Sequence, residues 1–126
     1  MTSSSPDATP FRPILRDLVR GVPDAIGAVF VDAQGEAIDF YAHLEEADLR
    51  LVGAHLGRVW TSLARAMEHS DAGSARELIL VGDRAKMLVR AIDREYYVVM
   101  TIKPRSPTAQ AARALATAAD RLRLEM

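Results

Sequence analysis

The side chains with the clearest chemical potential are three arginines, Arg50, Arg58 and Arg65, which recur within one segment. On an α-helix, at about 100° per residue, they project within about 80° of one another. A row of guanidinium groups can bind an acidic protein surface, and a single arginine can stabilise the charge of a phosphoryl group in transfer. Such a row is also typical of a solvated helix face. The pattern therefore predicts either a partner-binding surface or an ordinary polar face.

Other reactive side chains follow no pattern of a catalytic or metal site. The three histidines lack the spacing of metal ligands, and the chain has no cysteine. The acidic cluster of Glu45, Glu46 and Asp48 is explained by the preference for negative charge where a helix begins. The serines have no recognisable base nearby, and no glycine-rich phosphate loop occurs. We therefore expect no catalytic residue, metal or cofactor, and a protein that is not an enzyme.

Composition bounds the class of protein. A chain of 126 residues is sufficient for one domain with one core. With 16 basic and 17 acidic residues the formal charge is −1, and aromatic residues are only 6%, so binding to nucleic acid is not expected. No segment approaches the roughly 20 apolar residues of a membrane helix, and the start resembles no signal peptide. We expect a cytoplasmic domain without membrane insertion.

The residues from Asp48 to His69 form the clearest predicted element. Apolar side chains recur there at helical spacing and fall within an arc of roughly 100°. This segment is predicted to be a long amphipathic helix. Its apolar stripe consists of Leu49, Val52, Leu56, Val59, Trp60, Leu63 and Met67.

The first part of the chain predicts a helix, two strands and a hairpin. An amphipathic helix over Phe11–Arg20 ends at Gly21, because glycine can stop a helix and Pro23 cannot continue one. The apolar run Ala25–Val31 is typical of a strand covered on both faces. A short polar gap containing aspartate and glycine then favours a hairpin into an alternating, half-exposed strand around Ile38.

The remainder predicts three strands and a final helix. Strands are expected over Glu77–Val81, Lys86–Ile92 and Tyr96–Ile102, joined by short turns as an antiparallel meander. Lys86 and Arg90 share one strand face, which predicts partial exposure of both. Ser106 is expected as the N-cap of the last helix. The order α–β–β–α–β–β–β–α predicts an α+β fold with one five-stranded antiparallel sheet and helices on both faces.

These elements, together with the residues that form them, resemble the Roadblock (dynein light-chain) family, in particular its bacterial MglB-like branch. The matching segments are LRDLVRGVPDAIGAVFVDAQGEAI, the helix over Asp48–Met67, and ELILVGDRAKMLVRAIDREYYVVMTIKP. The final helix also matches in place and length, so that the resemblance covers about residues 11 to 124. We assign residues 1–10 to a disordered N-terminal tail and 11–126 to a Roadblock-like domain of Roadblock/profilin-like fold.

The resemblance implies a non-enzymatic interaction module. Family members form homodimers or heterodimers and many bind or regulate small Ras-like GTPases in signalling or cell polarity. Their dimers pair the third strands edge to edge and pack the second helices together. We therefore expect a homodimer with a small Ras-like GTPase as partner. A small-ligand sensing domain of profilin-like fold, or a structural scaffold without a GTPase partner, are the alternatives.

Small residues on one flank of the long helix suggest a place for the dimer contact. Glycine inside a helix costs about 1 kcal/mol relative to alanine, so two glycines there require a reason. Close approach of a second copy is one reason, and close packing on the protein's own sheet is the other. The apolar strand that starts at Glu77 is also a poor solitary edge. The predicted dimer-interface residues are Gly53, Leu56, Gly57, Trp60, Ala64, Leu78 and Leu80, and the predicted partner-binding residues are Arg50, Arg58 and Arg65.

Overall fold

The computed structural model describes residues 9–43 and 46–126, and the side chains of residues 46–54 lie outside the described part. The predicted order of elements is confirmed. The helices are α1 (Arg12–Gly21), α2 (Glu46–His69) and α3 (Thr108–Leu124). The strands are β1 (Ala25–Asp32), β2 (Ala37–Ala42), β3 (Glu77–Val81), β4 (Lys86–Ala91) and β5 (Tyr96–Ile102).

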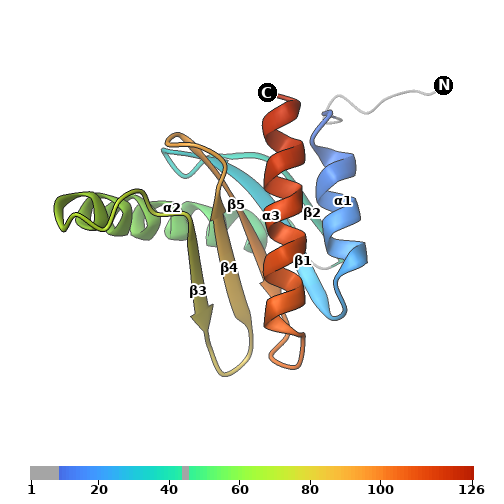
Figure 1. The fold of residues 1–126 in the computed structure, drawn as a ribbon. Coiled ribbons are helices and arrows are strands. Elements are labelled where there is room, and N and C mark those ends of the chain that lie inside the picture. The colour runs from blue at the N-terminus through green and yellow to red at the C-terminus, as the bar shows by residue number, and fades with distance from the viewer. Residues whose placement is uncertain (1–8, 44–45) are drawn as a thin grey trace.

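The five strands form one antiparallel sheet in the order β2-β1-β5-β4-β3 (Figure 1). The apolar runs that predicted β1 and β5 thus occupy the inner positions, where both faces of a strand are covered. The meander of the last three strands is confirmed, and β2 and β3 are the two edges. The predicted α+β class, with helices on both faces of the sheet, is also confirmed.

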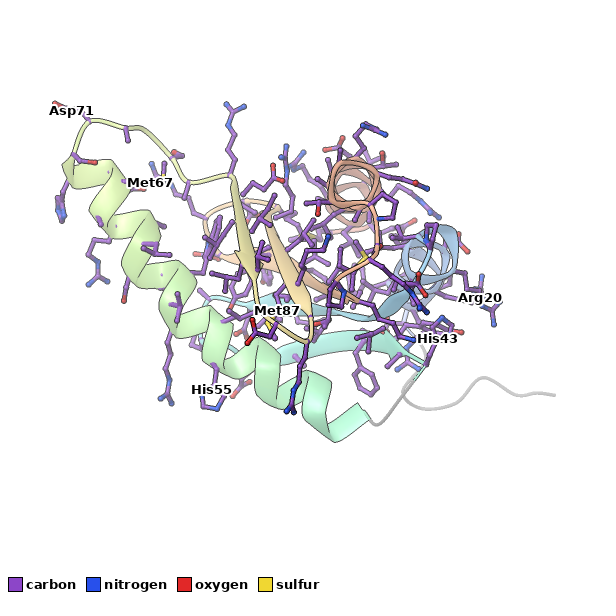
Figure 2. The ribbon with its side chains drawn as sticks, turned by 90° about the horizontal axis from the view of Figure 1, so that it is seen from below. Arg20, His43, His55, Met67, Asp71 and Met87 are labelled. Atoms are coloured by element: carbon purple, nitrogen blue, oxygen red, sulfur yellow. The ribbon has the colours of Figure 1, made fainter. Side chains whose placement is uncertain are left out.

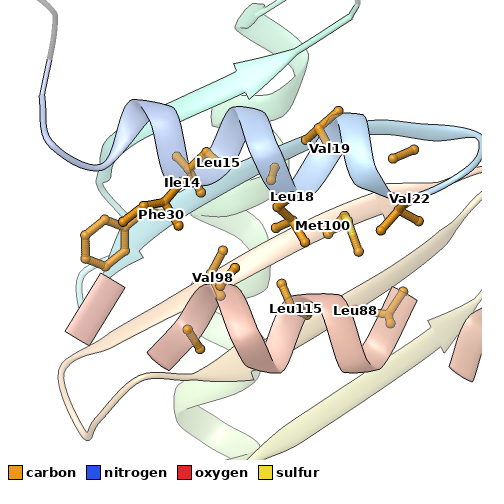
Figure 3. Packing of buried hydrophobic residues seen from close by; sticks show 14 of the residues in the cluster. Ile14, Leu15, Leu18, Val19, Val22, Phe30, Leu88, Val98, Met100 and Leu115 are labelled. Carbon is orange, nitrogen blue, oxygen red and sulfur yellow. The ribbon is translucent and has the colours of Figure 1, made fainter. Parts of the chain in front are cut away.

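One face of the sheet is covered by α1 and α3, which lie side by side (Figure 1). Leu15 of α1, Leu115 of α3 and Met100 of β5 are buried in the same apolar cluster (Figure 3). The buried residues of α3 include three alanines, Ala111, Ala118 and Ala119. Because an alanine side chain is short, the helix axis can approach the strands closely. This face therefore holds a filled apolar core.

The opposite face is covered by α2, which packs mainly on β1 and β2. Leu56 and Trp60 are buried there with Val29, Tyr97 and Val99 of the sheet. The far end of α2 then continues past the edge strand β3 (Figure 1), and Figure 2 shows α2 on the side of the sheet away from α1 and α3. The helix thus covers one half of this sheet face much more completely than the other.

The connection before α3 differs from the prediction. Ser106 is not the N-cap, because the helix begins at Thr108 with Pro107 as the N-cap residue and without a side-chain capping bond. The Ser106 hydroxyl instead donates a hydrogen bond to the carbonyl oxygen of Pro23, 2.6 Å away. Next to it, Arg105 donates two hydrogen bonds to Asp24, whose pKa they lower. A side chain that was expected to start a helix therefore joins two loops that are distant in sequence.

Lys86 is a second correction, because it is buried rather than partly exposed. Only 9% of it is accessible, and its Nζ donates to the Ser106 carbonyl oxygen and to Thr108 Oγ1, both at 2.7 Å. A buried ammonium group needs such acceptors, since desolvation without them is costly. Arg90, on the same strand, is half-buried as predicted and lies 3.5 Å from Glu77.

Gly57 of α2 sits where no other side chain fits. A Cβ atom at this position would lie 2.1 Å from the hydroxyl oxygen of Tyr97 and 2.9 Å from Cα of Gly35. Gly35 lies between β1 and β2 and has a φ of 84°, a conformation that favours glycine. The close approach of α2 to its own sheet therefore explains Gly57, as the alternative reading of the sequence proposed.

We predict that Gly57→Ala lowers the free energy of unfolding by about 1–3 kcal/mol, because overpacking outweighs the better helix propensity of alanine. Urea denaturation measures the change. Gly21→Ala is the matched control, since a Cβ there meets no atom within 4 Å and should leave stability nearly unchanged. A Gly57→Ala protein as stable as wild type would show that α2 is free to move away from the sheet.

We further predict that Tyr97→Phe is neutral or stabilising and partly restores the stability of Gly57→Ala. The Tyr97 hydroxyl is buried without a hydrogen-bond partner among the described residues, and burial raises its pKa to about 12. Removing an unsatisfied polar atom has little cost, and here it also removes the closest contact. A double-mutant cycle in urea measures the coupling, and strictly additive effects of the two substitutions would argue against a direct contact.

Candidate interaction site

Exposed and half-buried apolar side chains of α2, β3 and β4 lie on the side of the sheet that α2 covers. We call this set the α2–β3 apolar surface and define it by Val59, Leu63, Leu78, Leu80 and Met87. Val59 is 44% exposed, Leu63 43% and Leu80 39%, and the other two are half-buried. Figure 2 shows Met87 on the side of the sheet where α2 lies.

Strand alternation explains why these side chains face the same way. Leu80 is paired with Met87 and Leu78 with Val89, and Val89 belongs to the core beneath α2. Ile79, between them, pairs with Leu88 of the opposite core. Side chains two apart share a face, so Leu78 and Leu80 extend the α2 side of the sheet to its edge. The surface thus joins an exposed helix flank to an unpaired strand.

The predicted interface residues are found in three different settings. Leu56, Gly57 and Trp60 are buried in the chain's own core, which leaves them little surface for a second molecule. Leu78 and Leu80 lie on the α2–β3 apolar surface. In a third setting, Ala64 is half-buried on the flank of α2 that bears Gly57. Gly53 is in the part of α2 whose burial and contacts are not described.

Val59 and Leu63 were not among the predicted interface residues. Both belong to the periodic apolar stripe of α2, which on periodicity alone indicates core. They occupy the flank of the stripe opposite to Gly57 and are exposed because the helix is held over β1 and β2. An arc of roughly 100° is the ordinary width of a core-facing stripe, so nothing in the sequence distinguishes these two residues from the buried ones.

The predicted row of arginines is only partly visible. Arg58 and Arg65 are exposed, and their guanidinium groups have no hydrogen bond or ion pair within the described part of the chain. Arg50 lies in the part of α2 whose side chains are not described. Arg65 lines a surface groove, whereas Arg58 does not.

This groove lies between the second half of α2, the 74–76 segment, the β4–β5 turn and the end of α3. It has a volume of about 730 Å³, and we call it the arginine groove. Its lining includes the largely buried side chains of Trp60 and Ile92, one from each of the two apolar cores. The arginines along its walls are Arg65, Arg76, Arg90, Arg94 and Arg123.

These two surfaces present exposed apolar side chains and guanidinium groups. The side chains that the structure describes, those of residues 9–43 and 55–126, include no group of three or more histidine, aspartate or glutamate residues placed to hold a metal ion. None of the helices in residues 9–43 and 46–126 combines the length and the apolar composition that crossing a bilayer requires. What the described residues offer is an apolar surface next to an open strand and, separately, a groove rich in guanidinium groups.

Solved structures provide the comparison, since no family model and no curated protein matches the sequence. A Roadblock/LC7 domain from Streptomyces avermitilis is similar with a TM-score of 0.80 at 16% identity, over 87% of this chain and 92% of that one. The gliding protein MglB from Thermus thermophilus has a TM-score of 0.82 at 13% identity, over 98% and 93%. MglC from Myxococcus xanthus has a TM-score of 0.67 at 23% identity, over 92% and 98%.

The likeness extends over nearly the whole of each chain, so it concerns a complete fold and not one shared motif. It agrees with the element order, the sheet order and the single long helix on one face. The resemblance noted in the sequence is thereby confirmed at the level of structure. This chain has the fold of Roadblock/LC7 domains and of bacterial MglB.

Proposed function

We propose that this protein is a homodimeric interaction module that binds a small Ras-like GTPase and regulates or localises it. The observation that supports the dimer is the α2–β3 apolar surface, which lies beside an edge strand. Soluble monomers seldom expose a continuous apolar patch next to unpaired strand hydrogen-bonding groups. A second copy related by a two-fold axis would cover both at once.

The contact would use both elements of the surface. Pairing of β3 with its copy would satisfy the free backbone groups of the edge and continue the sheet into the second subunit. Val59 and Leu63 of each α2 would then lose water together with Leu78 and Leu80. Hydrophobic burial at about 25 cal/mol per Å² makes these side chains the main source of affinity.

The GTPase part of the proposal rests on the resemblance to the Roadblock family and on the likeness to MglB. Arg58 and Arg65 provide a basic, exposed side of α2 that an acidic protein surface can approach. An effect on nucleotide hydrolysis would come from ordering the switch loops of the GTPase, because the described residues suggest no catalytic group. The protein would thus act by binding and not as an enzyme.

We predict that wild-type protein is a dimer at micromolar concentration and that Leu80→Arg converts it to a monomer. A buried guanidinium group without a partner opposes association strongly. Ile79→Arg is the matched control, because Ile79 is also 39% exposed but faces the other side of β3. It should weaken association much less. Size-exclusion chromatography with light scattering decides, and a monomeric wild type would refute the dimer.

We predict that Arg58→Glu weakens binding of the GTPase at least about tenfold and leaves the dimer intact, because charge reversal repels an acidic surface. The measurement uses purified Ras-like GTPases of the same genome, loaded with GDP or a GTP analogue, in biolayer interferometry. Arg113→Glu on the exposed side of α3 is the charge-matched control. Lack of binding in both nucleotide states would contradict the proposed partner, and equal affinity of Arg58→Glu would remove Arg58 from the site.

A small-ligand sensing domain remains the main alternative from the sequence. It requires a pocket between sheet and helix with a few converging polar groups. Both helix–sheet layers are instead occupied by apolar core side chains in the described part of the chain. A thermal-shift screen with nucleotides and metabolites separates the alternatives, since strong stabilisation by a small molecule would favour the sensor.

A further inference from the structure

We propose that the arginine groove is a second binding site, which takes an acidic, extended segment of a partner protein. The groove lies on the Gly57 flank of α2, opposite to the flank with Val59 and Leu63, so it is separate from the proposed dimer contact. The proposal does not depend on the partner being a GTPase.

The lining of the arginine groove carries more positive than negative charge. Its walls carry five arginines and three acidic residues, whereas the whole chain has a formal charge of −1. Two of the acidic groups are already engaged. Asp93 accepts hydrogen bonds from the backbone N–H groups of Glu95 and Tyr96, and Asp120 pairs with Arg123 at 3.2 Å. Asp120 is therefore paired with a cation of the same lining, and Asp93 is held in place by the backbone of the β4–β5 turn.

The arginines of the groove differ in whether they already have a partner within the protein. Arg123 is held in place because it donates to the carbonyl oxygen of Ile92, and Arg90 pairs with Glu77. The guanidinium groups of Arg65, Arg76 and Arg94 have no hydrogen bond or ion pair among the side chains that the structure describes. Glu68 is the remaining carboxylate of the lining, and no hydrogen bond or ion pair joins it to these three arginines in the described part of the chain. An incoming acidic segment would find donors that need no internal contact to be broken.

The positions of the unpaired arginines indicate the kind of ligand that the groove would take. The free arginines come from three separate places, namely α2, the segment before β3 and the β4–β5 turn. The helix ends at the groove are the C-terminal parts of α2 and α3, whose dipoles disfavour phosphate and carboxylate alike, so the kind of ligand follows from the spacing of the arginines. Arginines distributed along a groove suit carboxylates distributed along a peptide, and the apolar residues of the lining can contact peptide side chains between those carboxylates.

The test measures binding of a fluorescein-labelled peptide of alternating glutamate and serine by fluorescence anisotropy at low ionic strength. A peptide with glutamine in place of glutamate is the ligand control. We expect saturable binding of the glutamate peptide, little binding of the glutamine peptide, and a decline of affinity with added salt. Absence of saturable binding of the glutamate peptide would overturn the proposal.

The decisive comparison uses two charge-matched double variants. Arg76→Glu with Arg94→Glu should weaken binding of the glutamate peptide at least about tenfold. Arg84→Glu with Arg113→Glu changes two exposed arginines outside the groove and should alter affinity less than about twofold. Equal losses would overturn the proposal, because they would indicate diffuse attraction by the net charge. Arg76→Gln with Arg94→Gln provides a milder variant should the charge reversal disturb folding.

Two other occupants are distinguished by the same proteins. Dissociation of the dimer by Arg76→Glu with Arg94→Glu would show that a second copy fills the groove, which would overturn the proposal. Displacement of the peptide by equimolar ATP would also overturn it, by indicating a nucleotide pocket. A failure of GTPase binding leaves the peptide result unaffected, so the two proposals are tested separately.

Discussion

The close contact of α2 with the sheet at Gly57 is the constraint on which the other features depend. With no side chain at this position, the helix backbone reaches the Tyr97 hydroxyl and the turn glycine Gly35. Leu56 and Trp60, on either side, are then buried over the inner strands. The helix accordingly packs mainly on β1 and β2, and its far end continues past β3 (Figure 1).

Two surfaces follow from this one placement, one on each flank of α2. On one flank, Val59 and Leu63 remain exposed beside the uncovered side chains of β3. On the other flank, the helix and the β4–β5 turn enclose the arginine groove. An apolar surface next to a strand edge is suited to a stable, symmetric contact, whereas exposed arginines favour a weaker and salt-dependent one. The proposed dimer contact and the proposed binding groove thus lie on opposite flanks of the same helix.

The sequence predicts the elements well because their signals are local. The strands Glu77–Val81 and Tyr96–Ile102 are found within their predicted bounds, since β-branched and aromatic runs between turns are hard to mistake. Features that depend on distant partners were not predictable. The burial of Lys86 requires acceptors at Ser106 and Thr108, and the groove joins arginines from several elements whose spacing in sequence has no period. Periodicity likewise identifies the apolar stripe of α2 but not which part of it the sheet covers.

The most direct test of the central claim is amide hydrogen exchange of β3 as a function of protein concentration. In a dimer formed through this edge, the β3 amides that do not bond to β4 become hydrogen-bonded to the second copy. We expect their exchange to slow markedly between nanomolar and micromolar protein, while that of β2, the other edge strand, stays constant. Rapid exchange of these β3 amides at every concentration would contradict the account.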